Sequence, residues 1–333
     1  MTHRTPTPAS VFAAGIALLA LVALTPAPTP AAAAEQPLLF QLDDPRGDDH
    51  GDGTLLYPAN DDYVRGDLDL VSFAARRGDG GTWFEATFAR PIRKPDARAI
   101  DGLGTPLQSV AQLGFFTFNI DVYIDRDRQP GSGGVVALPG RKARIAPDHA
   151  WDRAVVLTPQ PHAARGELKR LLVRALEEEL DLDEPGLELA QAVEMRHRIP
   201  MDVEDRVFFP TRVRVRGQKV SFFVPDRFLG APASPEWSYV VAVSGADLLQ
   251  SFELTGRLGL SAADEDGLMI LPVTSGRPRD HFGGRERAPL QPPLVDILVP
   301  PGTTQEEVLQ SYDLAEGLPV ELPGVVPAEV GTE

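Results

Sequence analysis

Residues 116–124 read FTFNIDVYI and give the clearest indication of the fold. Apolar side chains alternate with polar ones at every second position from Phe116 to Ile124. This period of two predicts a β-strand with one buried face and one polar face, as in an antiparallel sheet. Similar apolar patterns, bounded by turn residues, occur at residues 68–73, 84–88, 239–244 and 294–299. The sequence therefore predicts an all-β fold, an antiparallel β-sandwich.

A hairpin is predicted farther along the chain, between Val213 and Val224. Apolar residues alternate with basic or polar ones on both sides of Gly217 and Gln218. A glycine-containing pair between two alternating runs is typical of a tight turn between antiparallel strands. We therefore expect two adjacent strands that are joined at this pair.

One segment departs from the strand pattern and predicts a helical insertion at about residues 160–205. Within residues 166–180, Leu168, Leu172 and Leu176 recur at helical spacing, and the acidic residues fall largely on the other side. A second, weaker helix is expected to run through Val193. The simplest role of the insertion is to cover one end or edge of the sandwich.

The composition narrows the range of partners. The chain has 333 residues, of which 48 are acidic and 32 basic, and its formal net charge is −16. This excess of negative charge argues against nucleic acid and anionic membranes, and it suits metal cations and neutral ligands. The sequence has no cysteine, which excludes a disulfide framework, thiol catalysis and zinc ribbons.

The first 34 residues match the pattern of a signal peptide. Arg4 precedes an apolar run from Val11 to Leu24, and an A-x-A motif ends at Ala34. The run is shorter than the roughly 20 residues that span a bilayer. We therefore expect cleavage after Ala34, a secreted or periplasmic protein, and no membrane insertion of the mature chain. Residues 35–315 are expected to form one domain and residues 316–333 a flexible tail.

The strongest local signal for chemistry is an acidic turn at residues 43–53, which reads DDPRGDDHGDG. Its carboxylates repel one another unless they are solvated or share a cation, and its glycines let several oxygens converge on Ca²⁺. An EF-hand does not fit, because a loop that starts at Asp48 has Ala59 where the bidentate glutamate belongs. A solvated acidic turn and a calcium site both remain open. The candidate calcium ligands are Asp44, Asp48, Asp49, Asp52 and, from the next strand, Asp69.

A second acidic turn follows the long strand. Asp121 and Asp125 lie on one face of that strand because their separation is even, and Asp127 follows at its end. Arg126 and Arg128 are close enough in sequence to neutralise these carboxylates. A salt-bridged turn is therefore the favoured interpretation.

Three tryptophans, Trp83, Trp151 and Trp237, are candidates for binding carbohydrate. An aromatic face packs against the C–H groups of a sugar ring, while polar neighbours bind the hydroxyls. Each tryptophan lies at the edge of an apolar run, so packing in the core or at its rim is the alternative.

Enzymatic signatures are absent from the sequence. It contains no Gly-x-Ser-x-Gly, phosphate loop, dinucleotide fingerprint or His-Glu-x-x-His motif. We therefore expect a protein that is not an enzyme. A glycoside hydrolase would need two carboxylates about 5–9.5 Å apart, and a pair without a recognisable motif stays an alternative.

Several motifs occur in a characteristic order along the chain. They are DPxGDDxGxG at 44–53, GDLDLxxF at 66–73, DVYID at 121–125, WDxAV at 151–155, FGG at 282–284 and VDILxP at 295–300. From about Leu38 to Tyr312, this ordered set resembles the C-terminal, DOMON-like module of glucodextranases and of some secreted pullulanases. The resemblance implies a β-sandwich similar to family 9 carbohydrate-binding modules, with structural calcium. It also implies a role in attachment to cell-surface or polymeric carbohydrate.

The sequence as a whole predicts an exported, non-catalytic binding protein that recognises carbohydrate or cell-envelope glycan and carries a structural Ca²⁺. A module that binds an envelope protein through its helical insertion is the first alternative, and the hydrolase is the second. Loss of retention on polysaccharide after aromatic substitutions would favour carbohydrate binding. Loss of binding after deletion of the helices would favour the protein partner.

Overall fold

The computed structural model of the chain describes residues 36–95, 107–179, 189–248, 267–276, 279, 281–284 and 290–328. The expected signal peptide, residues 1–34, lies outside these residues, so its cleavage stays a prediction. The described strands and helices belong to a unit that runs from Gln36 to Glu333.

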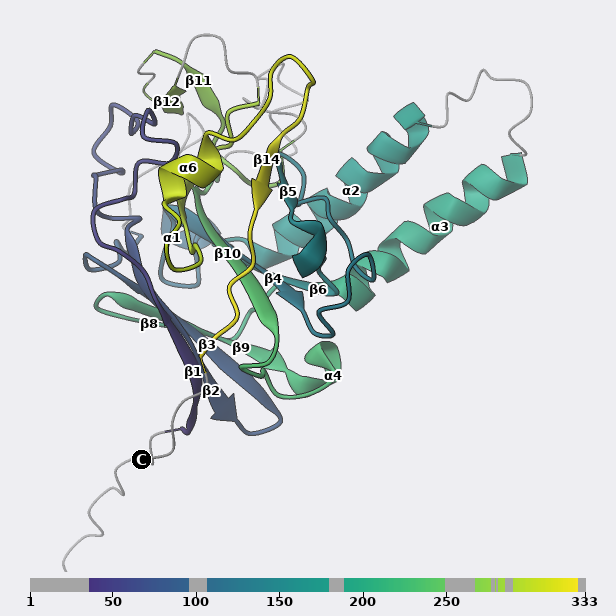
Figure 1. Cartoon of the computed structure of the whole chain (residues 1–333), viewed down its shortest axis with the longest axis horizontal. Helices are drawn as coiled ribbons and strands as arrows, with labels where there is room; N and C mark the ends of the chain where they lie inside the picture. The colour runs from purple at the N-terminus through teal and green to yellow at the C-terminus, as the bar shows by residue number, and fades with distance from the viewer. Residues whose placement is uncertain are drawn as a thin grey trace, which may run out of the picture. The chain divides into compact units, whose positions relative to one another are not determined.

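Two five-stranded sheets build the molecule (Figure 1). The first sheet has the order β1-β2-β3-β9-β8 and is antiparallel. The second has the order β13-β10-β4-β6-β7, in which β6 and β7 pair in parallel and the other pairs are antiparallel. The predicted antiparallel β-sandwich is confirmed. The strands of the first sheet are β1 (Leu38–Asp43), β2 (Leu70–Gly78), β3 (Gly81–Phe88), β8 (Val213–Arg216) and β9 (Lys219–Pro225), and those of the second are β4 (Phe118–Asp125), β6 (Arg153–Leu157), β7 (Val207–Phe208), β10 (Ser238–Gly245) and β13 (Leu294–Ile297).

The predicted hairpin is present as β8 and β9. Arg216 pairs with Lys219 across the turn, and Gly217 has a φ of 59°. This left-handed conformation suits glycine, which has no Cβ to clash with the backbone. Val213 and Val215 of β8 pack against the core, so the arginines between them point outward.

The main core lies between the two sheets. The ring centroid of Phe40, in the first sheet, lies 4.6 Å from that of Tyr239 in the second. Phe88 and Phe118 make the same kind of contact, at 4.8 Å. All four side chains are buried. Aromatic contacts of this kind bury large apolar areas, and that burial is what holds the sheets face to face.

Strand β4, which contains most of the alternating stretch, differs from its prediction on one face. All eight of its residues are buried, so the expected polar, solvent-facing side was wrong. The polar side chains of that side have partners inside the protein. Asp121 accepts a hydrogen bond of 2.7 Å from Arg141, and the Tyr123 hydroxyl accepts one of 3.0 Å from the Leu138 amide. Buried polar groups need such partners, because water is not available to them.

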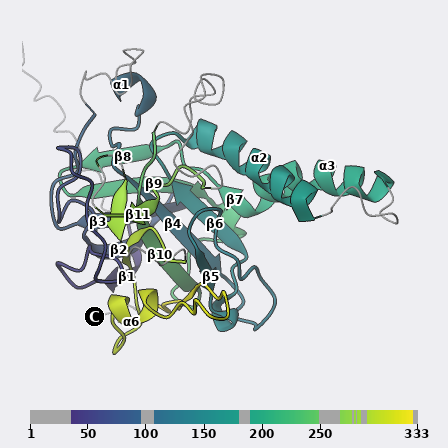
Figure 2. The ribbon, with the colours of Figure 1, turned by 90° about the horizontal axis from the view of Figure 1, so that it is seen from above.

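A second apolar cluster covers the outer face of the second sheet. It joins sheet residues such as Val156 to Leu168 and Leu171 of the helical insertion, and Leu172 packs against it. The insertion consists of α2 (Pro161–Glu179) and α3 (Leu189–Arg206), which lie side by side and extend beyond the sheets (Figures 1 and 2). The predicted helical insertion is therefore confirmed. Leu176 is only partly buried.

The remaining elements are short. One of them, β14, pairs in parallel with β5, and its residues Val320 and Leu322 are buried in the second cluster. This corrects the flexible tail expected from residue 316, because two apolar side chains hold residues 320–322 against the body. The short elements are α1 (Leu107–Val110), β5 (Ala143–Ile145), η1 (Pro147–His149), α4 (Asp226–Leu229), β11 (Val273–Ser275), β12 (Phe282–Gly284), α6 (Gln305–Leu309) and β14 (Val320–Leu322).

Candidate functional site

The acidic turn after β1 docks onto β13. The Gly51 amide donates a 2.9 Å hydrogen bond to the Val295 carbonyl. Gly51 has a φ of +57°, and a Cβ at this position would lie 2.8 Å from the Leu294 carbonyl oxygen. Glycine is therefore required here both by the backbone conformation and by the close approach of the strand.

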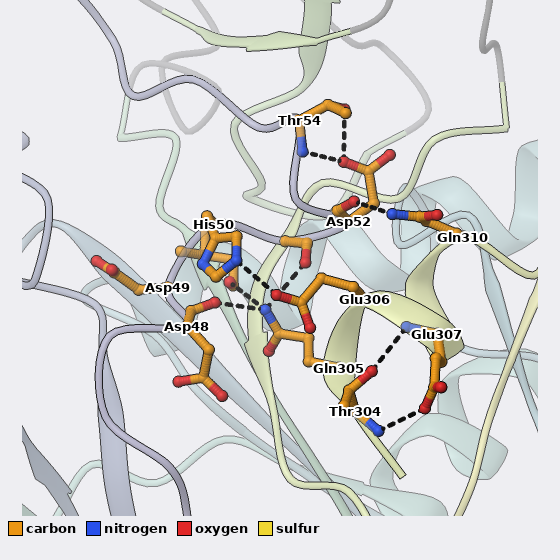
Figure 3. A network of polar contacts seen from close by, with 12 residues as sticks. Asp48, Asp49, His50, Asp52, Thr54, Thr304, Gln305, Glu306, Glu307 and Gln310 are labelled. Carbon is orange, nitrogen blue, oxygen red and sulfur yellow. Dashed lines mark hydrogen bonds and ion pairs between the residues drawn. The ribbon is translucent and has the colours of Figure 1, made fainter.

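Helix α6 holds the turn through Gln305, which also accepts a hydrogen bond from Ile297 of β13 (Figure 3). The Gln305 side chain donates to the carbonyls of Asp48, at 2.6 Å, and Gly51, at 3.0 Å. His50 and Glu306 lie 2.6 Å apart between Nε2 and Oε1. Thr304 caps the first turn of this helix in a capping box. These contacts place the carboxylates of the turn firmly against the second sheet.

Two carboxylates of the acidic turn meet a third from a distant part of the chain beside this clamp. Asp44 and Asp48 belong to the turn, Asp296 lies in β13, and one oxygen of each lies within 4.8 Å of the others. Each has a buried oxygen without a hydrogen-bond donor: Asp44 Oδ2, Asp48 Oδ1 and Asp296 Oδ1. Asp296 uses its other oxygen to accept a 2.7 Å hydrogen bond from the Leu70 amide of β2. We name this group the acidic cluster.

Burial and mutual repulsion make the acidic cluster hard to ionise. Burial, together with the charge of Asp48, raises the pKa of Asp44 to about 8. Burial also raises the pKa of Asp48 to about 6 and that of Asp296 well above its usual range. A bound cation reverses this effect, since it stabilises the charged form of each ligand.

The predicted distant ligand, Asp69, lies next to the acidic cluster. Its Oδ2 accepts a 2.8 Å hydrogen bond from the Gly47 amide, and its buried Oδ1 has no donor. Burial raises the pKa of Asp69, and its charge in turn raises the pKa of both Asp44 and Asp48. A cation at the cluster therefore has a fourth carboxylate nearby.

The other two predicted ligands mainly brace the turn. Asp49 accepts hydrogen bonds from the Tyr57 hydroxyl and the Gly66 amide. Asp52 accepts from the amide and hydroxyl of Thr54, at 2.9 and 2.6 Å. Each retains one buried oxygen without a hydrogen-bond donor. Their role as metal ligands stays a prediction.

Asp296 was missed among the candidate ligands. Its signal in the sequence is a single carboxylate inside the apolar run at residues 294–299. A charge at the centre of a buried strand is costly without a partner, so such a residue marks a site. Its distance from the acidic turn along the chain hid the connection.

The second acidic turn has internal partners of its own. One oxygen each of Asp125, Asp127 and Asp152 lies within 4.8 Å of the others. The Arg126 side chain, however, donates to Asp152 at 3.3 Å, and the Arg128 amide donates to Asp125 at 2.7 Å. The ion pair joins Arg126 to Asp152, and Arg128 contributes only its amide, so among the described residues the turn is held mainly by hydrogen bonds and the expected salt bridges to Asp125 and Asp127 are not formed.

The three candidate tryptophans lie at separate places and are all buried, at most 9% exposed. Trp237 belongs to the core between the sheets. Trp151 donates a 3.0 Å hydrogen bond to the Val136 carbonyl, and Arg206 lies over its ring. Trp83 lies on the outer face of the first sheet beneath two arginines. Sugar stacking on any of these rings stays a prediction, and it requires the covering side chains to move.

A known protein family matches the region that contains both sheets and the acidic turn. The model of the C-terminal, SLH-like binding module of glucodextranase matches residues 39–323. The chain belongs to this family. The resemblance inferred from the ordered motifs is therefore confirmed. No curated protein matches the chain.

The region matched to the glucodextranase binding module extends from β1 to β14. It includes both sheets, the acidic cluster, the helical insertion and α6. Membership of a family of binding modules gives the protein a binding role. In the part of this module that the structure describes, no helix has the length and apolar character needed to cross a membrane.

Proposed function

We propose that the protein is an exported, non-catalytic module that binds polysaccharide or cell-envelope glycan. The observation that carries this proposal is the family match over residues 39–323, because the family is one of binding modules and its name refers to an enzyme of a glucan. The signal-peptide pattern of residues 1–34 supports export. Intact-mass measurement of the exported protein should find Glu35, or its cyclised form, at the N-terminus.

We further propose that the acidic cluster holds a structural Ca²⁺. The donor set fits, since Ca²⁺ prefers carboxylate and carbonyl oxygens and three buried carboxylate oxygens here have no hydrogen-bond donor. Asp44, Asp48 and Asp296 would hold the ion, with Asp69 beside them. The ion supplies positive charge that allows these acids to ionise. The ligands then connect the end of β1 and the acidic turn with β13.

Binding of the mature protein to a glycan array, with calcium and with EDTA, tests the proposal. We expect retention of at least one polysaccharide or envelope glycan in calcium, with weaker retention in EDTA if the ion supports the folded state. Turnover of α-glucans, measured on the same preparation, should be absent. Hydrolysis of any of them would replace the proposal with the glycosidase alternative, and retention of no glycan at all would refute the proposal.

A second candidate function is docking of an envelope protein on the helical insertion. One observation favours it: Val193, Met195 and Met201 of α3 are exposed apolar side chains on helices that extend beyond the sheets (Figure 2). Replacing Met195 and Met201 with glutamine should abolish such docking while leaving glycan retention intact. If both substitutions leave every partner interaction unchanged, the helices serve only as a cover.

A further inference from the structure

The outer face of the first sheet is open, in contrast to the covered face of the second. Outward residues of β9, such as Lys219 and Phe223, are only partly buried, although their inward neighbours are buried. On β8 the outward arginines are exposed. We name this surface the basic face and define it by its basic side chains, which are Arg76, Arg212, Arg214, Arg216 and Lys219.

Strand register arranges the basic face in rows that cross the sheet. One row joins Arg76, Trp83 and Phe223, and the Phe223 amide donates to the Arg212 carbonyl at 3.0 Å. The next row ends at Arg214 of β8. The third row runs from Asp43 of β1 through Ser72, Thr87 and Lys219 to Arg216. Each row therefore ends in an arginine at the β8 edge, with Arg212 just before the strand and Arg214 and Arg216 within it, and these arginines stand at intervals of roughly 7 Å, two residues of an extended strand.

The three arginines of the β8 edge carry uncompensated charge. β8 and β9 contain no acidic residue. The central acid of the face, Glu85, is already engaged by Arg76 and Lys219, at 2.9 and 3.1 Å. None of the three edge arginines, at positions 212, 214 and 216, forms an ion pair within the described part of the chain. In a chain of net charge −16, this cationic edge is a local exception.

Aromatic rings hold two of these arginines in place. The guanidinium of Arg214 lies 4.0 Å from the Trp83 ring centroid, and that of Arg212 lies 4.5 Å from the Phe223 centroid. Stacking orders the planar guanidinium before a ligand arrives and leaves its N–H edges free. A pre-ordered guanidinium binds a carboxylate with two parallel hydrogen bonds at a lower entropic cost.

We infer that the basic face binds a carboxylate-bearing polysaccharide, with the edge arginines Arg212, Arg214 and Arg216 as its anion contacts. This inference rests on the proposed glycan-binding function and names its ligand class and site. Exposed arginines supply charge complementarity to carboxylates. Hydroxyl side chains at Ser72, Thr87 and Ser221 stand among them and suit a polymer rich in hydroxyl groups. The overall negative charge of the chain disfavours nucleic acid, whose charge density is far higher.

The test uses the mature protein in calcium, with hyaluronate as the carboxylated polysaccharide. Carboxyl-reduced hyaluronate serves as its neutral match, and poly-L-glutamate serves as a carboxylated polymer without sugar. We expect binding to hyaluronate, at least tenfold weaker binding to the reduced polymer and to poly-L-glutamate, and loss of affinity with added salt. Equal binding to poly-L-glutamate would show that the basic face binds any polyanion, and it would overturn the inference.

Matched variants locate the site. Arg214→Gln with Arg216→Gln should weaken hyaluronate binding at least tenfold. Arg144→Gln with Arg198→Gln removes the same charge from exposed arginines elsewhere and should leave binding unchanged. Arg214 packs on Trp83, so the double variant could fail to fold. In that case the single variant Arg216→Gln provides a second test, because no aromatic contact of Arg216 is present among the described residues. A severalfold loss is expected for it.

The outcomes separate the inference from the proposed function. If the protein retains neutral glycans but not hyaluronate, the proposed function stands and the inference fails. Equal hyaluronate binding by the two double variants would also overturn it, because the arginines of β8 would then only protect an edge strand from pairing with another chain. If no glycan of any kind is retained, both fail.

Discussion

The two sheets share one core, but their outer faces have opposite characters. In the second sheet, β4 is buried at all eight positions, whereas β9 of the first sheet alternates between buried and partly buried residues. Polar groups on the covered face therefore bind one another, as Asp121 and Arg141 do. On the open face, Arg76 and Lys219 pair with Glu85, and the edge arginines are left for solvent or a ligand. Alternation of apolar and polar residues therefore identifies which residues share a face of a strand, but it does not tell whether other segments cover that face.

The largest expected effect comes from breaking the ion pair of the covered face. Asp121→Ala leaves Arg141 charged and buried, with side-chain exposures of 2% and 1% for the pair, so unfolding free energy should fall by about 3–5 kcal/mol. Glu85→Ala on the open face is the control, and it should cost about 1 kcal/mol or less because its partners reach solvent. Urea unfolding measures both. Equal losses would mean that the two faces are equally covered.

The next effect tests whether the helical insertion is a cover. Leu168→Ala removes a fully buried side chain from the second apolar cluster and should cost about 2–5 kcal/mol. Met201→Ala, on an exposed part of α3, should stay within about 0.5 kcal/mol. A small effect for Leu168→Ala would show that α2 does not pack on the sheet in solution.

Calcium and pH test the acidic cluster, which links the two sheets through the bond between Asp296 and Leu70. The pKa values of Asp44, about 8, and Asp48, about 6, lie above the ordinary value of 3.8, so folding favours their protonated forms. In EDTA, their contribution to stability should therefore be present at low pH and decline as the pH rises from about 4 to 8. Calcium at a hundredfold excess over Kd should add about 2.7 kcal/mol and oppose this decline.

Melting curves between pH 5 and pH 8, in EDTA and in calcium, measure this effect. Asp48→Asn should remove the response to calcium, whereas Asp127→Asn, in the second acidic turn, should retain it. Identical curves in EDTA and calcium at pH 8 would show that the acidic cluster holds no ion.

The smallest expected effect is on stability at the open face. Arg216→Gln should change the unfolding free energy by no more than about 0.5 kcal/mol, because the side chain is exposed and has no ion pair within the described residues. Thermal unfolding beside the wild type measures it. A loss above about 1 kcal/mol would assign Arg216 a structural role.

Local patterns predicted the strands well, because apolar residues recur at every second position in any strand with one buried face. Both the hairpin at Gly217 and the helical insertion were predicted from spacing alone. The covered side of β4 was not predictable in the same way. Its cover comes from segments far along the chain, such as α2 and β14, and no local pattern reports that contact. The short apolar pair Val320 and Leu322 was likewise hidden among prolines and glycines.

The acidic turn was predicted as a candidate site because its carboxylates are adjacent in sequence. Of the expected ligands, Asp44 and Asp48 converge, while Asp49 and Asp52 accept hydrogen bonds from residues that follow the turn, such as Tyr57 and Thr54. The partner that completes the cluster, Asp296, lies more than two hundred residues away, and only the docking of the turn on β13 brings it close. The basic face was not anticipated either, since its rows follow from strand register.

Phenylglyoxal labelling of arginines gives the sharpest test of the claim that the open face is the binding surface. Peptide mass spectrometry reads the extent of labelling with and without hyaluronate. We predict that bound hyaluronate protects Arg212, Arg214 and Arg216 severalfold, while Arg144 and Arg198 label at unchanged rates. Protection at Arg198 of α3 with none on β8 would contradict the account, because it would place the ligand on the helical insertion instead of the open sheet.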